Sequence, residues 1–148
     1  MSYTLEFGLQ ATTDRATITA RTTGEVDEAL DRIIAAAPTF SHNPTVFVLE
    51  RPTFGPAEFP DHGLKFDINR DHGVAALAYV GPQFDGPSMT LSDPPLEAPV
   101  LYKDIDSATP FPASAAITLD QLRAAVHEFH ELGGLRPTCV AWQPADGW

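Results

Sequence analysis

The chain has 148 residues, of which 43% are hydrophobic and 20% charged, a composition typical of one folded domain rather than of a disordered chain. Nine basic and twenty acidic residues leave a net charge of −11, which disfavours direct binding to nucleic acids or to an anionic membrane surface. No stretch approaches the roughly 20 apolar residues that span a bilayer, and the first ten residues lack the pattern of a secretory signal peptide, so we expect a cytoplasmic protein.

The N-terminal part of the chain predicts a β-hairpin followed by a helix. Residues 3–9 alternate apolar and polar side chains, which indicates a half-buried strand, and the Thr- and Ile-rich run 15–21 is its expected partner. The sequence TTGE at 22–25 has the pattern of a capping box, and apolar residues then recur at helical spacing until Pro38 stops the helix. We therefore expect a first helix over about residues 24–37.

The middle of the chain predicts a second hairpin. Residues 64–69 alternate, so that Leu64, Phe66 and Ile68 share one face of a strand and the polar residues between them share the other. The run 70–73 ends in Gly73, which is free to adopt positive φ in a turn, and the apolar run 74–80 is the returning strand.

Shorter strands and two loops flank this hairpin. The β-branched, apolar run 45–50 predicts a buried strand, and two further short strands are expected over 88–92 and 100–103. Residues 51–63 and 81–99 are dense in proline and glycine, which break helices and central strands, so both stretches are predicted to be largely loop.

The best-specified element is a second helix over about residues 119–132. Thr118 and Gln121 form a capping box, and Gly133-Gly134 supplies a left-handed end. The predicted buried stripe consists of Leu119, Leu122, Val126, Phe129 and Leu132. A strand over 138–142 should follow, with the single cysteine, Cys139, as a buried thiol in that strand.

Taken together, these elements predict an α+β fold in one domain over residues 1–148. Strands follow one another along most of the chain and a helix is inserted near each end, which favours a mainly antiparallel sheet of about six to eight strands over a regular βαβ series.

Few residues suggest a chemistry. His127 and His130 share a helix face and could bind a metal with a nearby carboxylate, but their spacing of three differs from the spacing of four in metalloprotease helices. Simple helix-surface histidines are the plainer interpretation. No nucleophile elbow, phosphate-binding loop or zinc deaminase motif is present, so the sequence predicts no catalytic residue, no metal and no cofactor.

The C-terminal third carries a resemblance to a known family. Its residues are Tyr102, Pro110-Phe111-Pro112, Ile117, Leu119, Val126, Glu128-Phe129, Gly133-Gly134, Arg136-Pro137-Thr138 and Trp142-Gln143. This run resembles immunity protein family 1 of bacterial polymorphic toxin systems. Upstream, residues 22–27 and 76–80 are similar to the first helix of the family and to the strand before its variable loop.

The resemblance implies a protein that binds and neutralises a cognate secreted toxin and is not an enzyme. The toxins associated with the family are frequently nucleic-acid deaminases, with nucleases as the alternative, and we expect the inhibitor to occlude the substrate site. A toxin that acts on nucleic acid should carry a basic groove, to which an acidic inhibitor is complementary.

The contact surface is expected on acidic loop residues with a phenylalanine as apolar anchor. The candidate interface residues are Glu58, Phe59, Asp61, Phe84, Asp85, Asp93, Glu97, Asp104 and Asp106. Two other hypotheses stay open on the sequence: a small metal-dependent enzyme built on His127 and His130, and a ligand-binding or scaffold domain whose acidity serves solubility alone.

Overall fold

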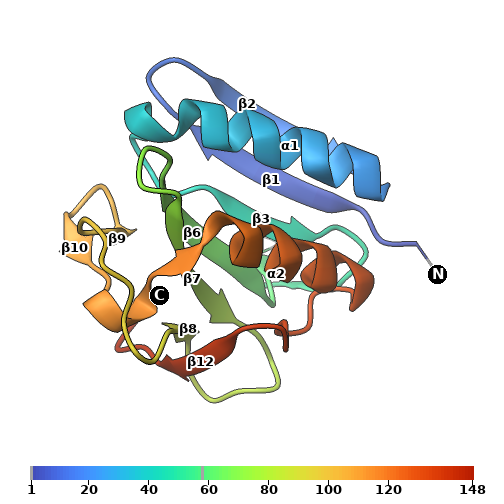
Figure 1. Ribbon diagram of the computed structural model, residues 1–148. Coiled ribbons are helices and arrows are strands. Elements are labelled where there is room, and N and C mark those ends of the chain that lie inside the picture. The colour runs from blue at the N-terminus through green and yellow to red at the C-terminus, as the bar shows by residue number, and fades with distance from the viewer. Residues whose placement is uncertain (1, 58) are drawn as a thin grey trace.

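An antiparallel sheet forms the centre of the protein, and two helices pack on one of its faces (Figure 1). The computed structural model describes residues 2–57 and 59–148. Within those residues the sheet has eight strands in the order β12-β8-β7-β6-β3-β1-β2, and β11 pairs with β7 beside this path. The α+β class with a mainly antiparallel sheet and two principal helices is therefore confirmed.

The strands of the sheet are β1 (Leu5–Gln10), β2 (Arg15–Ala20), β3 (Thr45–Val48), β6 (Gly63–Asn69), β7 (Val74–Val80), β8 (Ser88–Leu91), β11 (Ile117–Thr118) and β12 (Ala141–Pro144). The helices are α1 (Thr23–Ala36) and α2 (Leu119–Glu131), with short 3-10 turns η1 (Ala37–Thr39) and η2 (Ala113–Ala115). Two small hairpins lie outside the main sheet, β4–β5 (Thr53–Phe54 and Phe59–Pro60) and β9–β10 (Tyr102–Asp104 and Thr109–Pro110).

Local sequence signals set the starts of both helices and the end of α2 within one residue of the predicted positions. Thr22 and Thr118 each accept the backbone N–H of the residue three positions later at 3.1 Å, and the side chains of Glu25 and Gln121 accept in return, so both capping boxes are complete. After α2, Gly133 and Gly134 adopt φ values of 64° and 97°, which provides the left-handed helix end.

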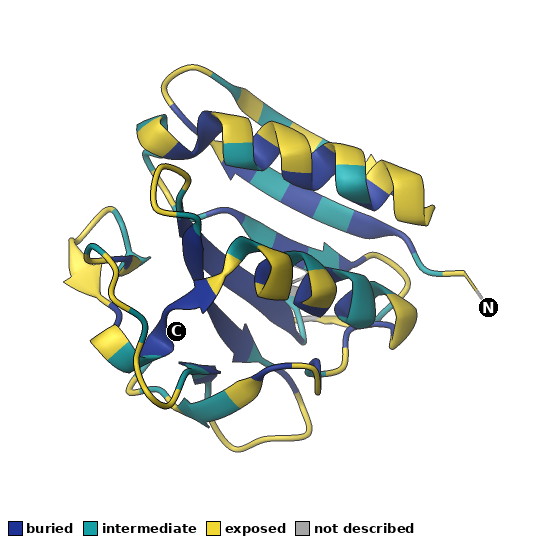
Figure 2. Ribbon diagram, in the orientation of Figure 1, coloured by how far each residue is buried: buried dark blue, intermediate teal, exposed yellow. Residues whose placement is uncertain are grey.

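The main core lies between the sheet and the two helices. Leu5, Phe7 and Leu9 of β1 are buried as the alternation predicted, and Figure 2 shows the buried stripes of both helices turned toward the sheet. In β7, Ala75, Leu77 and Tyr79 point into this core. The alternate residues of β7 belong to a second apolar cluster on the opposite face of the sheet, and they are Val74, Ala76 and Ala78.

The second face of the sheet is covered as well, which the alternation of β6 did not reveal. Leu101, Phe111, Ala115 and Ala116 pack there against β7. As a result Lys65 and Asp67, which occupy the polar face of β6, are 9% and 7% exposed. A strand with one polar face normally borders water, but here a later segment of the chain lies over it.

Three predictions for the C-terminal part are wrong. Leu132 is 39% exposed rather than buried, since α2 ends at Glu131 and the chain turns away. The last strand begins at Ala141 rather than 138. Cys139 is exposed and precedes that strand. For the last two, the physical reason is Glu128, whose carboxylate accepts the N–H groups of Thr138 and Cys139 at 2.7 and 2.9 Å, so that these groups are not available to a strand.

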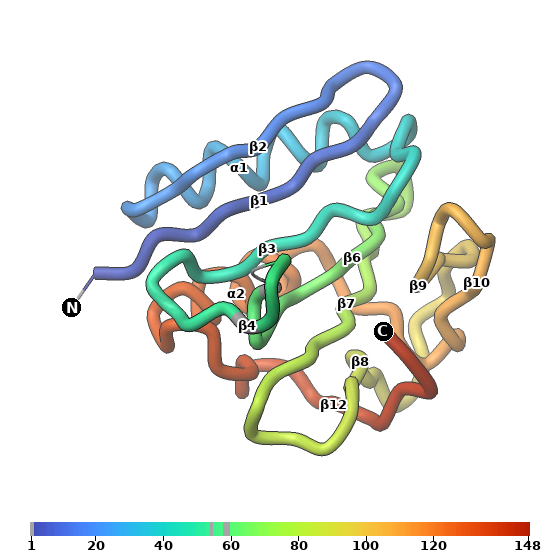
Figure 3. The backbone as a smooth tube through the Cα atoms, turned by 180° about the vertical axis from the view of Figure 1, so that it is seen from behind, coloured from blue at the N-terminus to red at the C-terminus, as the bar shows by residue number. Residues whose placement is uncertain are grey.

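The loops divide between two ends of the sheet. The β9–β10 hairpin lies at one end, and the connection from β7 to β8 lies at the other, in the front view and from behind (Figures 1 and 3). Candidate residues from these loops therefore cannot all belong to one contiguous patch.

Candidate functional site

The most distinctive surface is a long segment that we call the strap, residues 92–110. It leaves β8, crosses the face of the sheet opposite the helices and contains the β9–β10 hairpin. Backbone hydrogen bonds hold its first residue and its middle, from Ser92 N–H to Ser114 O at 2.7 Å and from Phe111 N–H, just after the strap, to Leu101 O at 2.8 Å. The strap is thus a fixed part of the fold.

Two buried or half-buried polar residues position the strap. The Asp67 carboxylate accepts the Tyr102 N–H at 2.8 Å. The Asn43 amide donates to Tyr102 O at 2.9 Å and its oxygen accepts the Ile105 N–H at 2.9 Å. Both side chains form hydrogen bonds with backbone groups of the strap that face the sheet. They therefore fix the distance of the strap from the sheet and its alignment along the strands.

The strap carries a concentrated negative charge. It holds Asp93, Glu97, Asp104 and Asp106 against a single basic residue, Lys103. Asp93, Glu97 and Asp106 are exposed. A hydrogen bond from the Ser107 N–H holds the pKa of Asp104 below its usual value. Within the described residues, none of the four carboxylates forms an ion pair.

Several acidic residues elsewhere are paired with an arginine. Asp14 pairs with Arg32 at 2.6 Å. Asp27 and Asp31 on α1 pair with Arg123 on α2 at 3.0 and 2.8 Å. The four carboxylates of the strap differ from these residues in that none of them has such a partner among the described residues.

Exposed apolar groups lie between acidic ones along the sequence of the strap. Val100 is 61% exposed and Tyr102 is 36% exposed, both on the strap. Aromatic and apolar groups surrounded by charged residues are typical of protein contact surfaces. The sequence analysis did not single out either residue as an anchor, because a valine and a tyrosine in a predicted strand are ordinarily assigned to the core.

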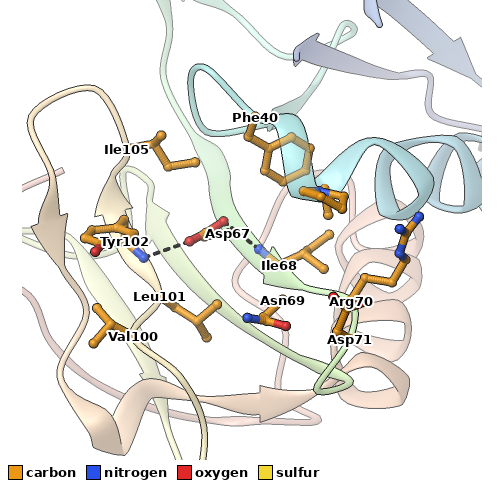
Figure 4. Close-up of a pocket in the computed structure, with 12 residues that line it drawn as sticks. Phe40, Asp67, Ile68, Asn69, Arg70, Asp71, Val100, Leu101, Tyr102 and Ile105 are labelled. Atoms are coloured by element: carbon orange, nitrogen blue, oxygen red, sulfur yellow. Dashed lines mark hydrogen bonds between the residues drawn. The ribbon is translucent and has the colours of Figure 1, made fainter. Parts of the chain in front are cut away.

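A cavity opens between the strap and the η1 turn (Figure 4). Its volume is about 310 Å³, and its apolar wall includes Phe40, Ile68, Val100 and Ile105. The carboxylate of Asp67 lies between the two sides, where it accepts the N–H groups of Ile68 and Tyr102, each at 2.8 Å. Burial raises the pKa of Asp67 above its usual value even though both hydrogen bonds oppose that rise.

The remaining candidate interface residues lie apart from the strap. Asp61 is half-buried, and its carboxylate accepts the Arg51 guanidinium at 3.1 and 3.0 Å. Phe84 and Asp85 are exposed in the β7–β8 connection, at the opposite end of the sheet from the β9–β10 hairpin. Glu58 and the side chain of Phe59 lie outside the described residues.

Phe84 belongs to a second surface that sequence reasoning missed. The Arg136 guanidinium lies 3.9 Å from the centre of the Phe84 ring and 5.5 Å from that of Trp142. Shallow hollows of about 440 and 330 Å³ flank this stack. Arg136 therefore joins two aromatic rings by cation–π contacts, and only the folded chain brings residues 84, 136 and 142 together.

The two histidines of α2 do not converge on a metal site. The Nε2 of His127 is 2.8 Å from Asp27 Oδ1, and the Nε2 of His130 is 2.7 Å from the carbonyl oxygen of Tyr3. These contacts join α2 to α1 and to the N-terminal segment. Across residues 2–57 and 59–148, no three His, Cys, Asp or Glu side chains are grouped as metal ligands.

Cys139 is not arranged as a nucleophile. Partial burial of the thiol, together with the Glu128 carboxylate, raises the pKa of Cys139 to about 11. The thiolate is the reactive form, so at neutral pH this group stays protonated.

His62 is a buried titratable group with a defined structural role. Its Nδ1 donates to Asp61 at 2.8 Å, and its Nε2 accepts the Val48 N–H at 2.8 Å, which requires the neutral ring. Burial lowers the pKa of His62 below its ordinary value of 6.5, an effect larger than the opposing hydrogen bond to Asp61.

We expect this histidine to make the protein less stable as the pH falls below about 6.5. The unfolded chain takes up a proton at His62 near pH 6.5, whereas the folded chain does so only at lower pH. The stabilisation by the neutral ring is complete above pH 6.5. It is lost progressively as the pH falls from about 6.5 to the folded-state pKa, at up to ~1.4 kcal/mol per pH unit, and the loss levels off below that pKa.

Urea unfolding between pH 7.5 and about pH 5 tests this expectation. The variant His62→Gln should be less stable but should lack the additional slope, whereas a substitution of the exposed His42 by Gln should retain it. Equal slopes in the wild type and in His62→Gln would assign the acid sensitivity to other groups. The pKa values of Asp61 and Glu128 are lowered, so their contributions are lost only at more acidic pH.

Along the described residues, no helix combines the length and the apolarity that crossing a membrane requires.

Comparison with known proteins identifies one family. The family model described as "Immunity protein Imm1" matches residues 14–144. The match includes both helices, the strap and all strands of the main sheet except β1. No curated protein matches the chain.

Proposed function

Because the chain belongs to the Imm1 family of immunity proteins, which are not enzymes, we propose that it neutralises a nucleic-acid deaminase toxin by covering the substrate groove with its strap. The single observation that carries this proposal is the composition of the strap surface. Exposed carboxylates without arginine partners precede and follow the exposed Val100 and Tyr102 along the strap.

Electrostatic complementarity supports this direction of binding. An enzyme that acts on DNA or RNA must hold phosphates with lysine and arginine side chains, so its groove carries positive charge. Asp93, Glu97 and Asp106 would occupy the place of these phosphates. Opposite charges accelerate the encounter of the two proteins, and the same charges exclude nucleic acid from the inhibitor itself.

The apolar residues would supply affinity that charge alone does not. Rim charges mainly set association rates and partner choice, whereas buried aromatic and apolar anchors dominate the binding free energy. Val100 and Tyr102 lie at the centre of the strap, between its acidic residues in sequence. This arrangement resembles the apolar centre and polar rim of protein interfaces.

The test uses the cognate toxin domain, which we expect to be encoded beside the gene for this protein. One equivalent of the immunity protein should abolish base deamination of a DNA or RNA substrate, and excess substrate should slow inhibitor binding. A toxin that cleaves nucleic acid without deaminating it would contradict the deaminase assignment. Tight binding that leaves catalysis intact would contradict occlusion of the groove.

Neutralising the strap should slow toxin binding. In the triple variant Asp93→Asn, Glu97→Gln, Asp106→Asn, the association rate at low salt should fall by about ten- to a hundred-fold, and its dependence on ionic strength should weaken. Stopped-flow or surface plasmon resonance measurements across a salt series give both quantities. Asp104 is left unchanged because its carboxylate accepts the Ser107 N–H at 3.3 Å.

A matched triple variant separates the strap from the net charge. Glu28→Gln, Glu131→Gln and Asp146→Asn remove three exposed carboxylates outside the strap. The change in net charge is identical, so this variant should bind nearly as fast as the wild type. Equal slowing in both triple variants would mean that overall charge, rather than the strap, steers the toxin.

A further inference from the structure

We propose that the cavity beside Asp67 is a recognition pocket for one arginine side chain of the toxin. This inference rests on the proposed function, because it names the chemical group that the strap surface would recognise. The pocket lies between the strap and the η1 turn, so a partner that covers Val100 and Tyr102 also covers its opening.

The first argument is the isolated charge of Asp67. The residue is 7% exposed, and its two oxygens accept only the N–H groups of Ile68 and Tyr102. Among the described residues no cationic side chain forms an ion pair with it. A buried carboxylate without a counter-charge is costly, so a cation that enters the pocket gains unusually strong attraction.

Two basic side chains close to Asp67 on the same hairpin have other partners. Lys65, two residues earlier on β6, has its Nζ 4.8 Å from the centre of the Trp148 ring. Arg70 lines the cavity, but its guanidinium donates to the carbonyl oxygen of Ala35 at 2.9 Å. Each carboxylate oxygen of Asp67 can accept a further hydrogen bond beyond the one from the backbone.

The second argument is the shape and lining of the cavity. A volume of about 310 Å³ lies at the lower end of the range for ligand pockets, which suits a single long side chain better than a cofactor. Phe40 and Tyr102 lie on its two sides (Figure 4). A guanidinium stacks on aromatic rings and pairs with a carboxylate in two-pronged geometry, whereas an ammonium group is more strongly hydrated.

The ligand set disfavours a metal ion. Asp67 and the exposed Asp71 are the acidic residues that line the cavity. No group of three His, Cys, Asp or Glu side chains suited to a metal occurs in the part of the chain that the structure describes. An organic cation that brings its own apolar stem fits this mixed surface better.

The experiment is a titration of the isotope-labelled protein with N-acetyl-arginine methylamide, followed by amide NMR. Saturable shifts are expected at Ile68 and Tyr102, whose N–H groups donate to Asp67, with a Kd on the order of millimolar. The citrulline analogue has nearly the same shape without the charge and should produce no such shifts. Citrulline binding equal to arginine binding, or no response at either amide, would overturn the proposal.

Two variants make the readout specific to the pocket. Asp67→Asn removes the charge, and Ile105→Trp fills the cavity while keeping the carboxylate, so either change should abolish the arginine-dependent shifts. Persistence of the shifts in a folded Ile105→Trp protein would place the probe elsewhere. The lysine analogue should bind at least several-fold more weakly, and equal binding would overturn the assignment to arginine.

This titration requires no toxin, so the two proposals fail separately. If the protein inhibits the toxin but the titration is negative, only the proposal of an arginine pocket is contradicted. A positive titration with a toxin that does not bind would remove the proposed function. With the toxin present, Asp67→Asn should accelerate dissociation by about ten-fold or more, because the partner cation would then be buried without its counter-charge.

Discussion

Replacement of Gly134 by alanine is expected to destabilise the protein by about 3 kcal/mol or more, as the sum of backbone strain and overpacking. Gly134 has a φ of +97°, which L side chains rarely adopt. An added Cβ would lie 2.7 Å from His62 Cδ2 and 2.9 Å from Arg51 Cδ. His62 is held in place by its bonds to Asp61 and Val48, so it cannot move aside without losing them.

Gly73→Ala is the matched control for this prediction. Gly73 also has a positive φ, +66°, but nothing lies within 4 Å of the position that an added Cβ would take. The control should therefore cost only the left-handed backbone strain, about 1 kcal/mol. Urea unfolding of the two variants measures the difference. Equal losses would show that the contact with His62 does not contribute.

Phe129→Ala is expected to cost about 3–5 kcal/mol, the range for a large aromatic removed from a core. Phe129 of α2 is 0% exposed, and its ring stacks on that of His62 with the centroids 5.8 Å apart. Its loss would leave a cavity between α2 and the sheet and would also remove one wall of the His62 site. The measurement is again the free energy of unfolding in urea. The m-value of the variant should equal that of the wild type, because a changed m-value would indicate a change in compactness or a departure from two-state unfolding.

Leu132→Ala provides the contrast. The helical spacing of the sequence assigns Leu132 to the same stripe as Phe129, but the folded chain leaves it 39% exposed at the end of α2. Its truncation should cost less than about 1 kcal/mol, as expected for a surface position. A loss comparable to that of Phe129→Ala would mean that Leu132 is buried in solution.

The candidate site was only partly accessible from the sequence. The acidic loop residues were recognisable, and four of them lie on the strap. The sequence did not show which of these carboxylates are free to bind a partner, because that depends on which of them form an ion pair with an arginine in the folded chain. Asp61 lies in a loop that looked equally suitable, yet Arg51 binds its carboxylate with two hydrogen bonds.

Anchors and cavities required the fold as well. Phe84 was expected to act together with the acidic residues, but it lies at the other end of the sheet from the β9–β10 hairpin and stacks with Arg136. The sequence did not predict Asp67 as a partner-binding residue, since a polar position in an alternating strand predicts a solvent-facing side chain. Its burial results from contact with Tyr102, 35 residues later in the chain.

Determinants that act within a few residues were readable from the amino-acid sequence alone. Capping boxes at Thr22 and Thr118, the glycine end of α2 and the alternation of β1 depend on local backbone chemistry, and each lies where it was predicted. The family signature in the C-terminal third likewise required no coordinates.

Tertiary structure alone decided the order of the strands, the burial of the polar face of β6 and the place where the last strand begins. Each of these depends on contacts between distant residues, such as those of the strap with Asp67 and Asn43, whose free energies compete with local preference. A pattern of period two shows that a strand has two different faces. Whether the polar face meets water or another segment depends on where the rest of the chain packs, and in this protein that packing creates the acidic strap and the pocket beneath it.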